Sequence, residues 1–395
     1  MVQVISDNPD VGKLIQQIAD TVVGGGGFLH PEARLVEREG ELSIEAPTTV
    51  APRDMICRVP PNLLLPVEWF DLQLDGDQIG LGVPDDRATK EQLTLVEAMA
   101  ALFNATGRMT QHRTRSLFSL RKNEPSLFAL FAGVDEAGLH FWPDDMYSDF
   151  LATRTLAMAP EQLHLEGERP IEVLMPVIDF LNHEPRAGSY SLVDGFLASV
   201  RGHPLPSSDE CFLCYGRYDA RTLLVKFAYD HADLPFLFSC PLKFDLEGDV
   251  QLIIARNSTP MLGTQIPPQY SDIGWIMPEI GHSNELGITR LSYLPILQKD
   301  GQSTMRRILD LAVQVSLKHL SESERNELVD RLEREIVERN LDYLRKLQRS
   351  VAESNGDHIS NHLNTTMTRI AENQMNILMQ SVAKLEGSGS VGGVS

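Results

Sequence analysis

The sequence predicts a mixed α+β fold in which a β-rich core is split by a helical insertion and followed by a mostly helical C-terminal domain. Three observations support this prediction. Residues 28–58 and 171–215 are rich in β-branched residues and alternate as short strands do. Residues 85–145 between them carry apolar residues at three- and four-residue steps, as helices do. From residue 304 the same helical spacing continues almost to the end.

The N-terminal elements follow from local patterns. Residues 1–22 predict a short amphipathic helix with Val11, Ile15 and Ile18 on one face. Glycines at 24–27 end this helix, and the alternating stretch that follows predicts short strands joined by turns.

The helical insertion contains two clear apolar patterns and a third helix. The patterns run from Leu93 to Phe103 and from Leu127 to Phe131, and the third helix is predicted over residues 143–158. Asp144 and Asp145 suit its first turn, because acidic residues interact well with the helix N-terminus.

Strand character then returns in short pieces. Candidate strands are Ile178, 190–193, 196–200, 211–215 and, further on, 250–255. Each strand is too short to form a sheet alone, so the strands on either side of the insertion are expected to pair across it.

Charge and composition exclude several classes of partner. The 395 residues include 35 Lys and Arg against 55 Asp and Glu, a formal net charge of −20. This charge disfavours nucleic acid and anionic membrane surfaces and favours a protein substrate with a basic or Lys-bearing segment. There is no apolar run of about 18 residues, and four cysteines are typical of a reducing compartment, so we expect a cytoplasmic protein.

Two segments carry residues suited to chemistry. In residues 175–185 an apolar run ends in Asn182-His183, a pair that suits a tight turn with polar edges. In residues 209–219 a predicted strand ends at Tyr215, Gly216 permits a sharp turn, and a helix with paired leucines follows. We expect the turn after Leu181 and the strand end at Cys214 to lie together.

Together these segments resemble the C-terminal half of a SET domain, in the class of the Rubisco large-subunit methyltransferase and its relatives. That class has a D-x-x-N-H segment, a strand ending in Y-G and a helix with paired leucines. The resemblance implies a split SET core in 1–84 and 146–240, a helical insertion in 85–145, and a substrate-binding domain in 241–386. Residues 387–395 are Gly/Ser-rich and predict a disordered tail.

The resemblance also implies roles for individual residues. Tyr215 corresponds to the catalytic tyrosine, and Asn182 and His183 correspond to residues beneath S-adenosylmethionine. Residues 151–156 resemble the family's S-R-x-F helix, which implies that Arg154 binds the cofactor. Asp179 would support the Asn-His turn.

Two positions depart from the family pattern. The expected G-x-G loop falls near residues 41–43, with Leu42 as the cofactor contact and Gly40 just before it. The family's second aromatic, usually tyrosine, falls at Phe227, with Tyr229 two residues later, and both are implied to contact substrate.

The leading hypothesis is therefore an S-adenosylmethionine-dependent protein-lysine N-methyltransferase, with histidine as an alternative acceptor. The glycine and Phe227 departures motivate a second hypothesis, a catalytically weak or inactive SET scaffold that binds protein. A third is a helical adaptor whose active part is residues 300–385. No metal is expected, because Cys211 and Cys214 are three apart in a predicted strand and their side chains point to opposite faces.

Overall fold

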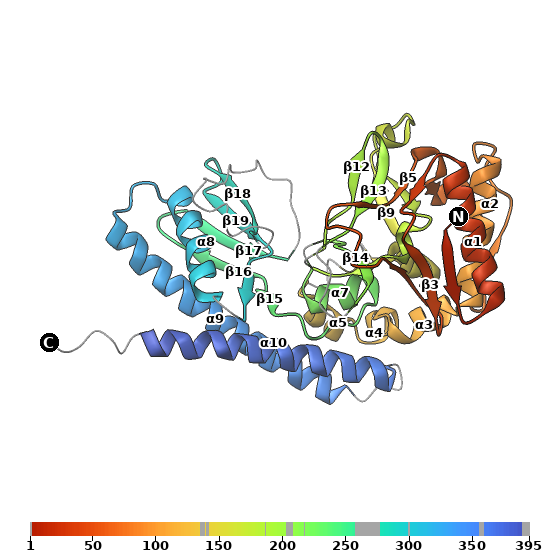
Figure 1. Cartoon of the computed structure of the whole chain (residues 1–395). Coiled ribbons are helices and arrows are strands. Elements are labelled where there is room, and N and C mark those ends of the chain that lie inside the picture. The colour runs from red at the N-terminus through yellow and green to blue at the C-terminus, as the bar shows by residue number, and fades with distance from the viewer. Residues whose placement is uncertain are drawn as a thin grey trace. The chain divides into compact units, whose positions relative to one another are not determined.

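The computed structural model confirms a mixed α+β fold (Figure 1). It describes residues 2–134, 139, 142–185, 187–202, 208–216, 218–256, 277–298, 301–354 and 359–388. Contacts divide the chain into two compact units. The first unit is Met1–Thr114 with Pro143–Tyr218, and the second is Arg115–Trp142 with Asp219–Ser395.

The first unit is built from three sheets and a hairpin. A five-stranded sheet has the order β1-β3-β4-β14-β11, and a four-stranded sheet has the order β12-β13-β5-β2. A three-stranded sheet, β6-β10-β9, and the β7–β8 hairpin complete it. The strands are β1 (Gln3–Ser6), β2 (Phe28–Leu29), β3 (Arg34–Arg38), β4 (Glu41–Glu45), β5 (Met55–Val59), β6 (Leu65–Pro66), β7 (Leu72–Asp75), β8 (Gln78–Leu81), β9 (Thr155–Met158), β10 (Ile171–Leu174), β11 (Asn182–His183), β12 (Ser191–Val193), β13 (Phe196–Val200) and β14 (Glu210–Leu213).

Strands from the two sides of the insertion pair with each other, as predicted. The green strand β13 lies antiparallel to the red strand β5, and β14 lies antiparallel to β4 (Figure 1). β10 likewise pairs with β6. All three sheets therefore depend on contacts between segments that are far apart in the sequence.

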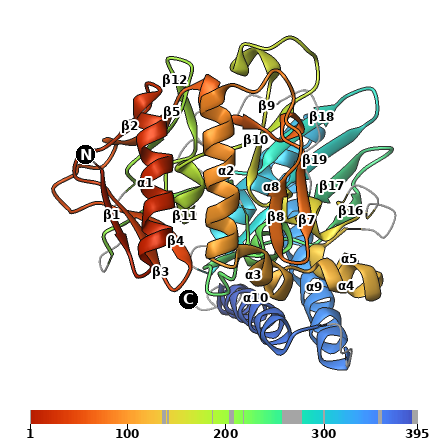
Figure 2. The same ribbon diagram turned by 90° about the vertical axis from the view of Figure 1, so that its right-hand side faces the viewer.

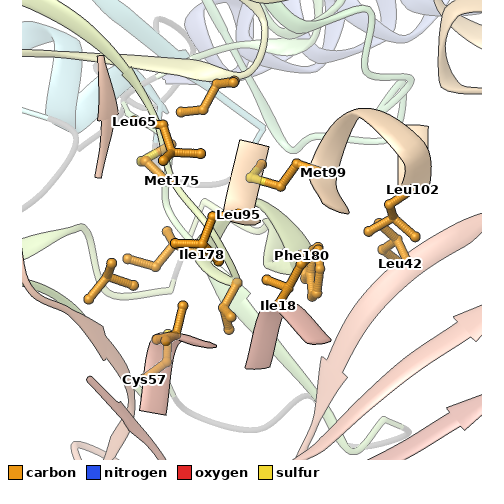
Figure 3. Close-up of a cluster of buried hydrophobic side chains, with 14 of the residues drawn as sticks. Ile18, Leu42, Cys57, Leu65, Leu95, Met99, Leu102, Met175, Ile178 and Phe180 are labelled. Atoms are coloured by element: carbon orange, nitrogen blue, oxygen red, sulfur yellow. The ribbon is translucent and has the colours of Figure 1, made fainter. Parts of the chain in front are cut away.

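Two helices cover this unit and enclose its core. α1 (Pro9–Gly24) and α2 (Lys90–Ala105) lie side by side (Figure 2). Ile18 of α1 and Leu95 and Met99 of α2 join a cluster of buried apolar side chains that includes Ile178 and Phe180 (Figure 3). The core thus packs directly against the segment that carries the Asn-His pair.

Three of the local predictions for this unit are wrong. Residues 3–6 form β1, an edge strand parallel to β3, and the helix begins only at Pro9, with Asn8 accepting a hydrogen bond from the Asp10 amide. The predicted helix over 143–158 is only α6 (Met146–Ala152), because Asp145 is its N-cap and residues 155–158 pair with β10. Ile178 begins the 3₁₀ turn η5 (Ile178–Phe180), not a strand.

The helices of the predicted insertion belong to different units. α2 and α3 (Arg108–Arg115) lie with the first unit up to Thr114, while α4 (Phe118–Asn123) and α5 (Pro125–Ala132) lie with the second. The predicted domain boundaries stay a prediction. α10 continues to Ser388, and residues 389–395 of the predicted tail lie outside the described residues.

The second unit contains more strand than predicted. Its helices are α4, α5, α7 (Ala220–Phe227), α8 (Gly301–Ser316), α9 (Glu322–Glu353) and α10 (Asn361–Ser388). The predicted strand at 250–255 is β17 (Gln251–Ala255), within a four-stranded sheet β16-β17-β19-β18. The remaining strands are β15 (Phe236–Phe238), β16 (Leu242–Asp245), β18 (Glu279–Ser283), β19 (Ile288–Ser292) and β20 (Pro295–Leu297).

Candidate active site

The two segments singled out in the sequence lie side by side in the first unit. β11 runs parallel to β14, with Asn182 opposite Phe212 and His183 opposite Leu213. The Glu184 amide donates to the Leu213 carbonyl at 3.2 Å, and the Cys214 amide donates to the Gly188 carbonyl at 2.9 Å. The expected meeting of the turn after Leu181 with the strand end at Cys214 is therefore confirmed.

Tyr215 is held at both its hydroxyl and its backbone. β14 ends at Leu213, so Tyr215 lies just beyond the strand. The Tyr215 hydroxyl donates to the Leu181 carbonyl at 2.7 Å, and its amide donates to His183 Nδ1 at 3.1 Å. Because Nδ1 accepts, the neutral His183 ring carries its proton on Nε2. Buried His183 thus positions the tyrosine backbone.

Gly216 makes the turn after Tyr215 possible. Its φ is +153°, and a Cβ at this position would lie 2.6 Å from the Tyr218 ring. A larger residue would therefore have to displace an aromatic ring next to the candidate catalytic tyrosine.

The segment before the Asn-His pair contains a strained turn. Val177 has φ +67° and ψ −46°, and the Ile178 amide donates to the Pro176 carbonyl at 2.8 Å. These values define a γ-turn of the rare positive-φ type, which is costly for a β-branched residue. Buried apolar packing holds Val177 there, and the turn leads directly into η5 and Asp179.

Asp179 is a buried member of a cluster of charged side chains. One of its oxygens is 3.5 Å from Arg154 Nη1, while Arg108 Nη1 is 2.9 Å from Glu41. Burial raises the pKa of Asp179, although the charges of Arg154 and Arg108 oppose that rise. Among the described residues, Asp179 Oδ2 and Arg154 Nε are buried without a hydrogen-bond partner.

Asn182 joins three strands. Its side-chain amide donates to the Leu42 carbonyl of β4 at 3.2 Å and to Glu210 Oε1 of β14 at 2.7 Å. Burial raises the pKa of Glu210, and the hydrogen bond from Asn182 opposes the rise. Asn182 therefore couples the predicted glycine-loop region to the Asn-His segment.

The expected loop at residues 41–43 is a paired strand. Residues 41–45 form β4, which pairs with β3 on one side and β14 on the other. Gly40 instead forms the β3–β4 turn with Glu39, and both residues have positive φ. The Leu42 side chain is buried and belongs to the same apolar cluster as Leu102 (Figure 3).

Phe227 and Tyr229 lie in the second unit. Phe227 is the last residue of α7, and the Tyr229 amide donates to the Leu223 carbonyl at 3.4 Å after a left-handed Ala228. The Tyr229 ring is 6.0 Å from that of His231. The two residues follow one helix end, and their role toward substrate stays a prediction.

The sequence reading missed two residues at this site. Arg108 lies in a strongly polar helix whose pattern resembles a solvated surface, and yet it is 7% exposed and its charge acts on Asp179. Glu210 is the acceptor for Asn182. Glu210 was predictable, because it is an acidic residue at the start of the strand that precedes Tyr215. The sequence around Arg108 contains no pattern that indicates its burial.

Neither a metal site nor a membrane span is found within the described residues. They contain no convergent group of three or more His, Cys, Asp or Glu side chains. In that same part of the chain no helix is both long and apolar enough to cross a bilayer. The four cysteines, including Cys211 and Cys214, are buried, and none of them forms a disulfide bond.

No family model and no curated protein matches this chain. Among solved structures the chain is similar to one described as the crystal structure of the SET domain of LSMT bound to lysine and AdoHcy. The TM-score is 0.43 and the sequence identity 12%, over 96% of this chain and 92% of that chain.

Proposed function

We propose that the chain is a SET-type protein methyltransferase of the Rubisco large-subunit methyltransferase class, which uses S-adenosylmethionine to methylate a lysine side chain of a protein. The observation that carries the proposal is the pair of hydrogen bonds from Tyr215 to Leu181 and His183. These bonds join the two segments whose residue types and order resemble the family's motifs.

The residues present suit the amino-acid end of S-adenosylmethionine. A cofactor carboxylate needs donors and its ammonium needs an acceptor. Arg154 Nε and Asp179 Oδ2 are a buried donor and a buried acceptor without a partner among the described residues. We assign Arg154 to the carboxylate and Asp179 to the ammonium, with Asn182, His183 and Leu42 contributing backbone groups.

When bound, S-adenosylmethionine supplies the methyl group as a positively charged sulfonium. The chain's own residues must then orient the acceptor amine and keep it neutral. A lysine with pKa about 10.4 costs roughly 4 to 5 kcal/mol to deprotonate at pH 7. The Tyr215 hydroxyl oxygen, fixed by its donation to Leu181, can accept a hydrogen bond from that amine and orient its lone pair.

Leu42 takes the middle position of residues 41–43, which stand where the family has its G-x-G loop, and it does not count against cofactor binding. Its side chain enters the apolar cluster, so it occupies the core and not the side of β4 from which Asn182 contacts the Leu42 carbonyl. We propose that the backbone of β4 still contacts the cofactor, and that Phe227 and Tyr229 contact the substrate.

The first prediction concerns Tyr215. We expect Tyr215→Phe to reduce transfer of radiolabelled methyl from S-adenosylmethionine to proteins of a source lysate by about 100-fold, because the amine loses its orienting group. Cofactor binding measured by calorimetry should change little. Tyr147→Phe, which removes the hydroxyl of another partly buried tyrosine of the same unit that lies near Asp145 and Asp71, serves as the matched control.

Two outcomes contradict the enzyme proposal. Label transfer that is undiminished by Tyr215→Phe would remove Tyr215 from catalysis. Clear absence of S-adenosylmethionine binding to the wild-type chain would favour the second hypothesis, a SET scaffold without catalysis.

A further inference from the structure

A cleft in the first unit lies apart from the candidate active site. Its volume is about 420 Å³, and none of its lining residues is a candidate cofactor residue. It is formed by the 3₁₀ turn η2 (Val67–Trp69), the start of β7, the segment after β8, and α6. The lining residues used below are Glu68, Trp69, Asp71, Val83, Asp85 and Tyr147. We call this region the acidic-aromatic cleft.

The cleft combines three carboxylates with aromatic walls. Asp71 has no basic partner within ion-pair distance among the described residues, and it accepts a hydrogen bond from Gln73 at 2.8 Å. The one ion-pair contact of Glu68 within the described residues is a long one, 3.9 Å, to Arg87. Val83 is 85% exposed, so the rim also offers an uncovered apolar side chain. Negative charge beside aromatic and apolar surface suits a cationic group with an apolar stem.

Two hydrogen-bond donors of wall residues have no acceptor among the described residues. Trp69 is 7% exposed, and both Trp69 Nε1 and the Tyr147 hydroxyl are buried without a partner in the part of the chain that the structure describes. An unsatisfied buried donor costs free energy until an acceptor reaches it. A ligand that fits this wall therefore carries carbonyl oxygens as well as positive charge.

One residue of the chain already shows how a cation binds here. The Arg87 guanidinium lies 5.1 Å from the centre of the Trp69 ring. It also forms two hydrogen bonds with Asp85, at 2.9 and 3.0 Å. This arrangement satisfies Asp85 and leaves Glu68 and Asp71 as the weakly neutralised carboxylates of the cleft.

We infer that the acidic-aromatic cleft binds an arginine-bearing segment of a partner protein. The arginine guanidinium pairs with Asp71 and Glu68, its stem lies along Val83 and the aromatic walls, and backbone carbonyls of the segment accept from Trp69 and Tyr147. A planar guanidinium is favoured because it both stacks on an aromatic ring and pairs with carboxylates, as Arg87 does. This inference does not depend on methyl transfer.

The test is fluorescence anisotropy at low salt with the full chain and a fluorescein-labelled Gly-Arg-Gly-Arg-Gly peptide. We expect saturable binding that weakens about 10-fold in Glu68→Gln/Asp71→Asn, which keeps the side-chain shapes and removes two charges. Asp20→Asn/Glu97→Gln removes the same charge from exposed helix positions outside the cleft and should leave binding unchanged. Tyr147→Phe should weaken it about threefold.

Three results would overturn the inference. The first is equal binding of a peptide with citrulline in place of arginine, because citrulline keeps the shape without the charge. The second is an equal loss of binding in the control double variant. The third is binding of spermine as tight as that of the peptide and equally sensitive to the cleft variants, because a polyamine has no carbonyl.

Discussion

At the residue scale, three side chains hold the candidate active site together. Tyr215, His183 and Asn182 each bond to backbone or side chains on a neighbouring segment. These contacts and the strand pairing join β4, β11 and β14, although β4 lies far from the other two strands in the sequence. Loss of the Asn182 or His183 side chain is therefore expected to affect the geometry of the site as well as its chemistry.

A second residue-scale feature, in the other unit, is the carboxyl group of Glu333. It is 1% exposed on α9, where one oxygen lies 3.6 Å from Arg306 and the other has no hydrogen-bond partner among the described residues. Burial raises the pKa of Glu333 to about 7, and the charge of Asp330 adds to the rise while Arg306 opposes it.

This raised pKa predicts the pH dependence of stability. The folded chain binds the Glu333 proton more tightly than the unfolded chain does, so protonation of Glu333 stabilises the fold. This stabilisation is fully present below about pH 4.5 and is lost as the pH rises through about 7. We expect Glu333→Gln to match wild type near pH 4.5 and to exceed it above pH 7, by on the order of 2 kcal/mol in the free energy of unfolding.

Thermal unfolding measured across this pH range provides the check. Glu338→Gln is the control, because Glu338 is an exposed acid on the same helix. If wild type and Glu333→Gln show the same change in melting temperature with pH, the buried carboxyl does not titrate as described.

At the element scale, the β3–β4 hairpin positions Leu42 for its contact with Asn182. Its turn uses Gly40 at φ +81°, where a Cβ would lie 2.9 Å from the Thr106 carbonyl oxygen. Gly76 in the β7–β8 hairpin has φ +61°, and a Cβ there would meet nothing within 4 Å. Both turns therefore place a glycine at positive φ, but an added Cβ would clash only at Gly40.

This pair of turns gives a matched prediction. We expect Gly76→Ala to cost about 1 kcal/mol of stability, which is the penalty for a left-handed alanine. Gly40→Ala should cost at least about 2 kcal/mol, because the clash with Thr106 adds to that penalty. Chemical denaturation measures both, and S-adenosylmethionine binding should weaken only in Gly40→Ala. If the two substitutions cost the same, the Thr106 backbone between α2 and α3 must move to accommodate the added methyl group.

At the scale of the whole molecule, long periodic elements and motif order were predictable from the sequence. The pairing of strands across the insertion followed from strand length, and the contact between the Asn-His segment and Tyr215 followed from motif order. β1 was missed because four residues beside a helix give no distinct period, and β9 because it directly follows a short helix. Arg108 and the γ-turn at Val177 depend on tertiary burial, which local pattern does not report.

The last prediction concerns the charge of the whole chain. At a net charge of −20 the folded state is opposed by repulsion among its acids, and this repulsion is screened as the Debye length falls from about 30 Å at ~0.01 M salt to about 8 Å at ~0.15 M. We therefore expect the melting temperature at pH 7 to rise by a few degrees over this range, and to rise equally in NaCl and KCl. A shift of this size corresponds to a gain of ~1 kcal/mol in the free energy of unfolding.

A variant with four exposed acids neutralised tests the cause of that rise. Glu97, Glu161, Glu327 and Glu338 are exposed and take part in no ion pair among the described residues, so their change to glutamine removes charge without breaking one. Because the repulsion is smaller, this variant should melt higher than wild type at low salt and gain less from added salt. A melting temperature that falls with salt in wild type would mean that attractive surface ion pairs such as Glu335 with Arg339 outweigh the repulsion, contrary to this expectation.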